Sequence, residues 1–240
     1  FKLGFAADTS NASSVHPFTG NISACRIYNK NLSTEEVRRN YNAVANNYGL
    51  VPWGQLIIHD AFGGSGTVSG RTPDTVNNGN NWVSIGAAMR VLSGYMTMNS
   101  SPAGSERSVV NPNATEFKII TQTQKLTSTT VKHGVVVHNT GAASTTTLLY
   151  LEANQLYRWE VAPSTGGTST LLGTWGYPST NVLDWEVEMD GTSMTYLIKD
   201  GATTMYSGTT TNLNSANSAG YYQNVQATNL TYCLDFKVYA

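Results

Sequence analysis

Four carboxylates occupy every second position of one short segment, in the order Asp184, Glu186, Glu188 and Asp190. Side chains alternate along a β-strand, so these four would lie on one face and the apolar residues between them on the other. Double displacement at a glycosidic bond needs two carboxyl groups about 5 Å apart. Glu186 and Glu188 could approach that separation, which makes this segment the candidate for hydrolytic chemistry.

A solvated outer face of a sheet is the other interpretation of the same segment. The carboxylates would then pair with cations on neighbouring strands, such as Arg158 or Lys199. We favour this interpretation, and glycoside hydrolysis by Glu186 and Glu188 stays the alternative.

Aromatic residues offer a different kind of site. Trp175 and Tyr177 stand in a segment that also contains Gly and Pro, which fits a loop better than a strand interior. Exposed Trp and Tyr rings can stack on the apolar C–H faces of sugars while neighbouring polar groups bind hydroxyls. With Tyr221 and Tyr222 they form the predicted ligand-binding set, and core packing is the alternative role for each ring.

Histidine and cysteine do not follow a metal-binding or nucleophile pattern. His133 and His138 are five residues apart in a predicted strand, so they would point to opposite faces and cannot chelate one ion together. No zinc-ligand spacing or Ser-His-Asp order is present. Cys25 and Cys233 lie in apolar, strand-like runs, which favours buried free thiols over a disulfide. The sequence therefore predicts no catalytic residue and no metal ligand.

Composition narrows the class of partner. The 240-residue chain has a net charge of -1, and only 12% of its residues are charged. Nothing in it indicates binding to nucleic acid or to an anionic membrane, and no apolar run reaches transmembrane length. Ser, Thr, Asn and Gly dominate the polar content, which is common in secreted and viral surface proteins.

Alternating or apolar runs predict β structure from Leu56 to the end of the chain. The predicted strands are residues 56–59, 88–92, 95–99, 116–121, 134–138, 147–152, 156–161, 183–189, 194–199, 221–226 and 231–239. Turn signals such as Asp190-Gly191 and Asp200-Gly201 separate them. Many short strands without a βαβ rhythm indicate a two-sheet antiparallel sandwich.

The first and last of these strands resemble each other. Residues 58–62 read Ile-His-Asp-Ala-Phe and residues 232–236 read Tyr-Cys-Leu-Asp-Phe. If the two strands pair in one sheet, the ends of this region meet, as a jelly roll requires.

The first fifty residues predict a different unit. Residues 22–28 form a short apolar run that suits a strand. Ser33 and Glu36 then have the spacing of a capping box, in which each side chain bonds the other residue's backbone amide. Val37, Tyr41 and Val44 recur on one face, so an amphipathic helix follows.

This opening segment resembles the C-terminal end of laminin-G-like, or concanavalin-like, jelly-roll domains. The residues that carry the resemblance are Lys-Leu-Gly at 2–4, Phe-Thr-Gly-Asn-Ile at 18–22, Arg-Ile-Tyr-Asn at 26–29 and Leu-Ser-Thr-Glu-Glu at 32–36. The resemblance covers about forty residues and implies that strands upstream of Phe1 complete the domain.

The later part resembles the concanavalin A-like lectin/glucanase superfamily. The matching residues are Asp60-x-Phe62, Trp82, the segment 91–96, Tyr157-Arg158-Trp159 and the segment 185–191. Gly63-Gly64 replaces an Asn-Arg pair that members often carry there, which leaves the subfamily open. Hydrolases of this superfamily place their acids in a Glu-x-Asp-x-x-Glu order, whereas this chain reads Glu-x-Glu-x-Asp and then turns. Related sandwiches sometimes bind Ca²⁺ in loops, so calcium is the one cofactor that the resemblance allows.

Together these patterns predict an all-β protein with three parts. Residues 1–47 would be the C-terminal part of a laminin-G-like jelly roll, 48–55 a linker, and 56–240 a concanavalin A-like antiparallel sandwich. Through the resemblance we expect a non-enzymatic structural and glycan-binding module on a virion surface, as a capsid decoration or fibre, or in a cell-surface adhesin. Its partners would be glycans, other structural subunits or further copies of itself. A glycoside hydrolase and an assembly or cement module without a ligand are the alternatives.

Overall fold

The chain separates into two compact units, residues 1–40 and 41–240. The computed structural model describes residues 28–45, 54–76, 80–85, 89–98, 104–125, 131–139, 145–152, 155–162, 166–174, 182–211, 213–214, 217–225 and 231–240. The predicted strand at residues 22–28 and the predicted linker at 48–55 fall largely outside these residues, so both stay predictions.

Helix α1 (Thr34–Ala45) begins at the predicted capping box. The Ser33 hydroxyl accepts the backbone N–H of Glu36 at 3.2 Å, and the Glu36 carboxylate accepts the backbone N–H of Ser33 at 3.0 Å. Two otherwise orphaned amides at the helix start are thereby satisfied. The predicted apolar stripe is open to solvent, because Val37 is 52% exposed and Tyr41 39% exposed.

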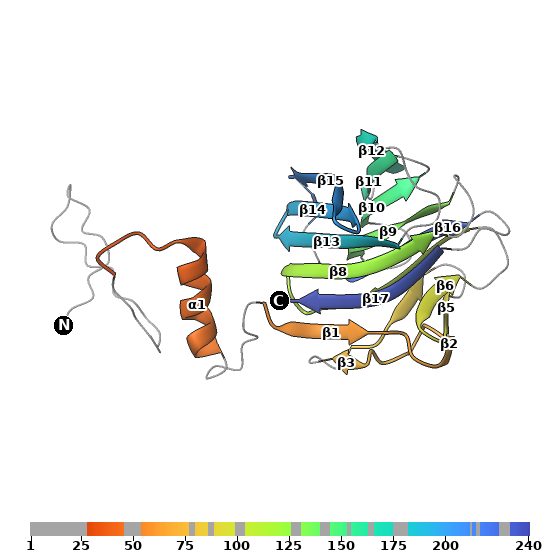
Figure 1. Cartoon of the computed structure of the whole chain (residues 1–240), viewed down its shortest axis with the longest axis horizontal. Helices are drawn as coiled ribbons and strands as arrows, with labels where there is room; N and C mark the ends of the chain where they lie inside the picture. Colours follow the sequence, from red (N-terminus) through yellow and green to blue (C-terminus); the bar gives the residue numbers. More distant parts are fainter. Residues whose placement is uncertain are drawn as a thin grey trace. The chain divides into compact units, whose positions relative to one another are not determined.

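The first of two antiparallel sheets has ten strands. Its continuous order is β15-β14-β13-β8-β17-β6-β5-β2, and β1 pairs with both β17 and β3 (Figure 1). The strands are β1 (Leu56–Asp60), β2 (Ser65–Thr67), β3 (Thr75–Val76), β5 (Met89–Leu92), β6 (Tyr95–Met98), β8 (Glu116–Lys125), β13 (Val182–Asp190), β14 (Ser193–Asp200), β15 (Thr203–Thr210) and β17 (Thr231–Tyr239).

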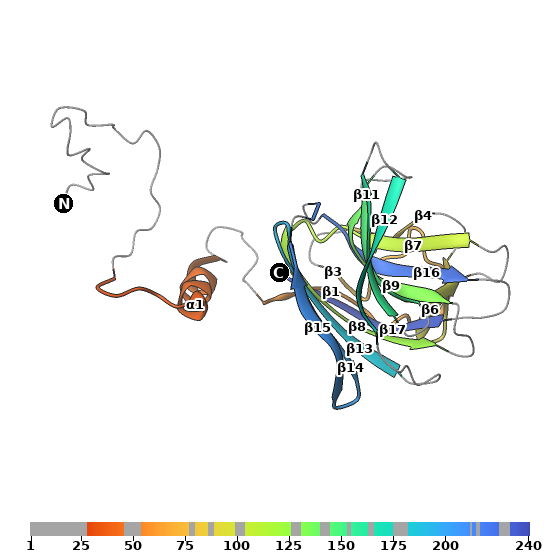
Figure 2. The same cartoon turned by 90° about the horizontal axis from the view of Figure 1, so that it is seen from above.

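The second sheet has seven strands in the order β12-β11-β10-β9-β16-β7-β4. They are β4 (Val83–Ile85), β7 (Gly104–Val110), β9 (Lys132–Asn139), β10 (Thr146–Glu152), β11 (Gln155–Ala162), β12 (Gly166–Thr174) and β16 (Ala219–Val225). Seen from above, β8, β13 and β17 belong to one layer and β7, β9 and β16 to the other (Figure 2). The predicted all-β antiparallel sandwich is confirmed.

Every strand that the sequence predicted from Leu56 onward is present. The sequence missed β2, β3, β4, β7, β12 and β15. Three of these are only two or three residues long, and β12 and β15 are rich in Gly, Ser and Thr, so they lack hydrophobic alternation. The glycine-rich segment from Gly63 to Gly70 contains strand β2, which pairs with β5.

The first and last strands of the sandwich pair, as their similarity predicted. Strand β1 runs antiparallel to β17, with Leu56 opposite Tyr239 and Asp60 opposite Phe236. The backbone N–H of Ala240 continues the ladder by donating to the Gln55 carbonyl at 3.1 Å. The last residue of the chain therefore lies beside the start of the sandwich (Figure 1).

The core lies between the two sheets. Trp185, Val187 and Met189 of β13 point inward with 0% exposure, while the acidic residues between them point outward. From the opposite sheet, Val135 and Leu149 complete the same cluster. This alternation is the pattern expected for strands with one buried face.

A buried carboxylate joins β1 to the loops that follow it. Asp60 is completely buried, and its oxygens accept from Nε and Nη2 of Arg71, each at 2.9 Å. They also accept the indole N–H of Trp82 at 2.9 Å and the backbone N–H of Phe62 at 2.8 Å. Phe62 has a φ of 55°, a conformation that non-glycine residues rarely adopt. Four donors thus compensate the buried charge and hold this strained turn in place.

Asp60→Ala tests this network. The change leaves the Arg71 guanidinium and the Trp82 indole without their shared acceptor, so unfolding should become easier by about 3–5 kcal/mol. Urea denaturation of the full chain measures the loss. Asp184→Ala, on the outer face of the ten-stranded sheet, is the matched control and should change stability by about 0.5 kcal/mol or less. Equal stability of the two variants would contradict the assignment.

Glycines in the seven-stranded sheet allow close cross-strand contacts. Gly134 of β9 lies opposite Tyr222 on one side and Tyr150 on the other. A Cβ at Gly134 would approach the Leu149 carbonyl oxygen to 2.0 Å, far inside van der Waals contact. Only glycine fits there without displacing backbone.

Gly134→Ala should therefore destabilise the fold by about 3 kcal/mol or more, because rigid backbone must move to admit the methyl group. Gly63→Ala provides the control, since a Cβ at Gly63 meets nothing within 4 Å. Thermal unfolding of both variants compares the two sites. A tolerated Gly134→Ala would mean that β9 and β10 are not packed as described.

Candidate functional site

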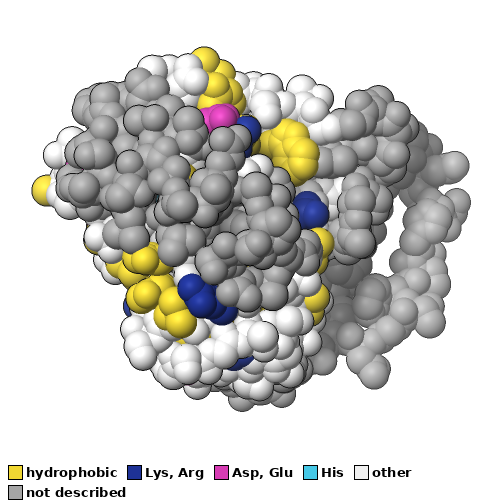
Figure 3. Space-filling model, turned by 90° about the vertical axis from the view of Figure 1, so that its right-hand side faces the viewer, with side chains coloured by type: hydrophobic (Ala, Val, Ile, Leu, Met, Phe, Trp, Pro, Cys, Tyr) yellow, Lys and Arg dark blue, Asp and Glu magenta, His cyan; other side chains and the backbone are white. Residues whose placement is uncertain are grey.

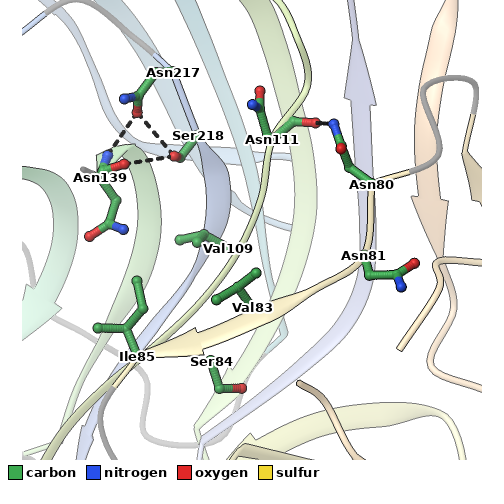
Figure 4. Close-up of a pocket in the computed structure, with 10 residues that line it drawn as sticks. All are labelled: Asn80, Asn81, Val83, Ser84, Ile85, Val109, Asn111, Asn139, Asn217 and Ser218. Atoms are coloured by element: carbon green, nitrogen blue, oxygen red, sulfur yellow. Dashed lines mark hydrogen bonds between the residues drawn. The ribbon is translucent and has the colours of Figure 1, made fainter. Parts of the chain in front are cut away.

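A hollow of about 790 Å³ opens beside the edge of the seven-stranded sheet (Figure 4). Its described lining combines asparagine and serine side chains with three aliphatic ones. The residues are Asn80, Asn81, Val83, Ser84, Ile85, Val109, Asn111, Asn139, Asn217 and Ser218. They come from β4, from β7, from the end of β9 and from the segments that enter β4 and β16.

The aliphatic residues lie on the short edge strand β4 and on its neighbour β7. Val83 pairs with Val109, and Ile85 follows two residues later on β4. Val83 is 52% exposed, whereas its partner Val109 is buried. In Figure 4 the side chains of Val83 and Val109 lie side by side between the polar groups. The hollow therefore has an apolar floor.

One polar wall is fixed by a small hydrogen-bond network. The side-chain oxygen of Asn217 accepts the backbone N–H of Asn139 at 2.9 Å and the Ser218 hydroxyl at 3.0 Å. The side-chain oxygen of Asn139 accepts the Thr146 hydroxyl at 3.1 Å. Both amide groups are held through their oxygens, so their NH₂ groups are the parts available as donors.

The opposite wall comes from the segment before β4 and from the turn after β7. The Asn80 amide donates to the backbone carbonyl of Asn111 at 2.9 Å, and the side-chain oxygen of Asn111 accepts the backbone N–H of Asn113 at 2.7 Å. Asn81 accepts the Thr72 hydroxyl at 2.9 Å. Figure 4 shows these residues across the apolar floor from Asn217 and Ser218.

The lining suits an uncharged, polyhydroxylated ligand. None of the described lining residues carries a charge, and five of them are asparagines. An amide offers both donors and acceptors, as a sugar hydroxyl does, and the aliphatic floor can contact C–H groups. Among the described lining residues, the amide and hydroxyl groups can bind the hydroxyls of a ligand through hydrogen bonds.

The structure describes two of the four predicted ligand-binding aromatics. Trp175 and Tyr177 lie outside the described residues, so their role stays a prediction. Tyr221 and Tyr222 are neighbours on β16 and point to opposite faces of the sheet. Both are buried, with exposures of 0% and 5%. The Tyr221 hydroxyl shares a 2.7 Å hydrogen bond with Thr231, so this ring packs the core and offers no stacking face.

Tyr222 belongs instead to an aromatic cluster on the outer face of the seven-stranded sheet. Its ring meets Tyr150 edge-on at 5.8 Å, and Tyr150 stacks on Tyr157 at 5.4 Å. Val109 of the hollow belongs to the same cluster. The apolar floor is therefore continuous with an aromatic cluster farther along the sheet.

The carboxylate segment has the outward orientation that the sequence predicted. Glu186 lies between two lysines, with its oxygens 2.7 Å from Lys118 Nζ and 3.4 Å from Lys199 Nζ. The hydrogen bond from Lys118 holds the pKa of Glu186 below its ordinary value of 4.5. A general acid for glycoside hydrolysis needs a raised pKa. The pairing with Lys199 agrees with the solvated-face interpretation.

Metal and thiol chemistry find little support among the described residues. Within them, no group of three or more His, Cys, Asp or Glu side chains could hold a metal ion. Cys233 is a free, fully buried cysteine, and burial raises the pKa of its thiol. Cys25 lies outside the described residues. Calcium binding therefore stays a prediction.

The described surface also carries little acidic charge on the face shown in Figure 3, where hydrophobic and basic groups appear among mostly uncharged ones. Helix α1 is the one helix that the structure describes, and it is neither long nor apolar enough to cross a membrane.

No family model and no curated protein matches the sequence. Solved structures match in fold. One of them comes from work on endo-acting O-glycanases, which members of the human gut microbiota express to initiate mucin breakdown. It has a TM-score of 0.54 at 8% identity, and the match covers 78% of this chain and 99% of that chain. The carbohydrate-binding module CBM66 of Bacillus subtilis has a TM-score of 0.49 at 8% identity, covering 64% of this chain and 94% of its own.

The exoplasmic/lumenal domain of VIP36, in its Ca²⁺/Man3GlcNAc-bound form, has a TM-score of 0.48 at 10% identity and covers 66% of this chain and 82% of that chain. At such identities the likeness concerns the fold alone. The sandwich architecture is shared, and the laminin-G-like assignment of the first unit stays a prediction.

Glu186 makes a testable contribution to pH-dependent stability. Its pKa is lowered in the folded chain, so the lysine contacts stabilise the fold above the ordinary value of 4.5, and this contribution disappears as the pH falls through the folded pKa. Glu186→Gln should lower the urea midpoint at neutral pH and have no effect in strong acid. The same substitution in a Lys118→Met, Lys199→Met background should lower the midpoint less. A pH-independent effect would overturn this account.

Proposed function

We propose that the sandwich is a non-catalytic glycan-binding module whose ligand occupies the asparagine-lined hollow. The observation that carries the proposal is the combination of five asparagines, an aliphatic floor and no described charge in one hollow of about 790 Å³. Binding pockets for organic ligands typically have volumes in this range, with an apolar lining and a few fixed polar groups. The hydrogen bonds that fix Asn217 and Asn139 orient their amides before a ligand arrives.

The chemistry selects a neutral saccharide. An acidic sugar would meet no described cation in the hollow, and its carboxylate would lose hydration without a partner. A neutral pyranose instead offers hydroxyls to the amides and a C–H face to Val83 and Val109. The saccharide and mannose ligands of the fold neighbours belong to the same chemical class.

The setting that we propose is extracellular, on a virion surface or in a cell-surface adhesin. The low charge and the Ser-, Thr- and Asn-rich composition support it. Residues 1–47 would belong to an adjoining laminin-G-like domain of the same surface protein.

A glycan array followed by calorimetry tests the site. Neutral saccharides should bind the full chain, and Val83→Asp should weaken binding at least about tenfold, because it replaces the apolar floor by a charge. Asn81→Ala should weaken it less. Thr195→Asp on the outer face of the other sheet is the control. A chain that binds no glycan on the array would favour the assembly module without a ligand.

Salt and calcium separate the remaining possibilities. If both the saccharide and the lining of the hollow are uncharged, the affinity of the chain for the saccharide should change less than about twofold between roughly 50 and 500 mM NaCl. The reason is that salt screens interactions between charged groups. A steep fall would contradict a neutral ligand. Titrations with EDTA and with added Ca²⁺ show whether calcium takes part.

Trp175 and Tyr177 are a second proposed contact. If the ligand also stacks on this aromatic pair, Trp175→Ala should abolish or strongly weaken binding while leaving the urea midpoint unchanged. Unaltered affinity would confine the site to the hollow. Loss of binding in Trp175→Ala with full binding in Val83→Asp would move the site to the aromatic pair.

A further inference from the structure

Strand β12 forms a long free edge of the seven-stranded sheet. It spans nine residues, and among the described residues no strand pairs with its outer side. The edge strands β2, β3 and β4 are only two or three residues long. Short edges offer few unpaired backbone groups, which protects a sheet from pairing with other chains. Strand β12 lacks this protection.

Its sequence also lacks two other protective devices, charged residues and proline. Gly166–Thr174 reads Gly-Gly-Thr-Ser-Thr-Leu-Leu-Gly-Thr, without a charged residue or a proline. Strand β15, the long edge of the other sheet, is similarly neutral. Its Thr210, however, accepts a hydrogen bond from Arg158 of β11, and its register shifts near Thr204. Strand β12 keeps one unbroken register from Gly166 to Leu171 against β11, and its own register shift lies beyond Leu171, between Leu171 and Gly173.

A protruding side chain and a glycine occur on this edge four residues apart. Leu171 is 49% exposed, which makes it one of the few large exposed hydrophobic residues of the described chain. Gly167 has no side chain, and the Trp159 ring lies directly over it, since a Cβ there would come within 2.0 Å of the indole nitrogen. Residues 167, 169 and 171 share one face, because side chains alternate along a strand.

From this geometry we propose that two copies of the chain pair antiparallel through β12, with the twofold axis at Ser169. In that register each residue lies opposite the one equally distant from Ser169, so Leu171 of each copy faces Gly167 of the other. Each Leu171 then packs against the partner subunit's Trp159. The interface is isologous, as a twofold dimer requires, and it continues the seven-stranded sheet across the axis.

The energetics favour a second copy of the chain over a charged peptide as the partner of β12. The edge supplies backbone donors and acceptors at no electrostatic cost, because neither copy brings a charge to the axis. Two Leu171 side chains lose their exposed surface at once, which adds a hydrophobic gain to the ladder. A basic or acidic strand would find no counter-charge on Gly166–Thr174.

Sedimentation velocity of the full chain tests the proposal. The wild type should sediment as a dimer, and Leu171→Lys should shift it to monomer, because two lysines would have to approach the paired edges. Thr209→Lys, on the exposed edge strand β15, is the matched control and should remain dimeric. A monomeric wild type, or a Leu171→Lys variant that stays dimeric, overturns the proposal.

Disulfide trapping tests the register itself. Ser169→Cys in a Cys25→Ser background should form a covalent dimer on mild oxidation, because residues paired across a strand ladder have the Cα separation of about 4.4–6.8 Å that a disulfide needs. Thr209→Cys in the same background should stay monomeric on a non-reducing gel. Absence of cross-linking at position 169 in a chain that sediments as a dimer would show that the copies meet elsewhere and would overturn the β12 assignment.

Discussion

The buried carboxylate of Asp60 is the constraint on which the architecture around the candidate site depends. It lies at the end of the first strand, where β1 pairs with the last strand of the chain. Its bonds to Arg71 and Trp82 tie the following loop back onto the core. Burying one unpaired charge would cost several kcal/mol, so the loop has little freedom to adopt another path. Because Trp82 immediately precedes β4, this anchor also places the strand that provides the floor of the hollow.

The hollow then follows from the way the seven-stranded sheet ends. Strand β4 has only three residues and covers β7 incompletely, so Val83 and Val109 stay beside open space. Asparagines cluster there because they stand at strand ends and turns, where an amide can bond neighbouring backbone. Asn217 and Asn111 both accept backbone N–H groups. The same bonds that terminate the strands therefore leave oriented polar groups around an apolar surface.

The two outer faces of the sandwich differ in chemistry. The ten-stranded sheet presents charged pairs such as Glu186 with Lys118, which are solvated and satisfied. The seven-stranded sheet carries the aromatic cluster of Tyr150, Tyr157 and Tyr222 beside the hollow, together with the Lys132–Glu152 ion pair. An aromatic cluster and the uncharged, amide-rich lining of the hollow thus occur together on one face. This combination directs the functional proposal to that sheet.

Sequence periodicity by itself determined most of the fold. Alternation along residues 183–189 predicted which face of β13 is buried, Gly191 predicted its hairpin, and Ser33 with Glu36 predicted the start of α1. Strands β12 and β15 were not predicted, because segments rich in Gly, Ser and Thr do not alternate between hydrophobic and polar residues. Only their pairing with β11 and β14 identifies them as strands.

Only the tertiary structure decided where the site residues lie. Asn80, Asn139 and Asn217 are far apart in sequence, and each has the appearance of an ordinary turn residue. Tyr221 and Tyr222 were predicted to bind ligand, yet the sheet buries one ring in the core and the other in the outer cluster. A sequence shows the period of a strand, which is local. It does not show which strands become neighbours, and a binding surface depends on that long-range pairing.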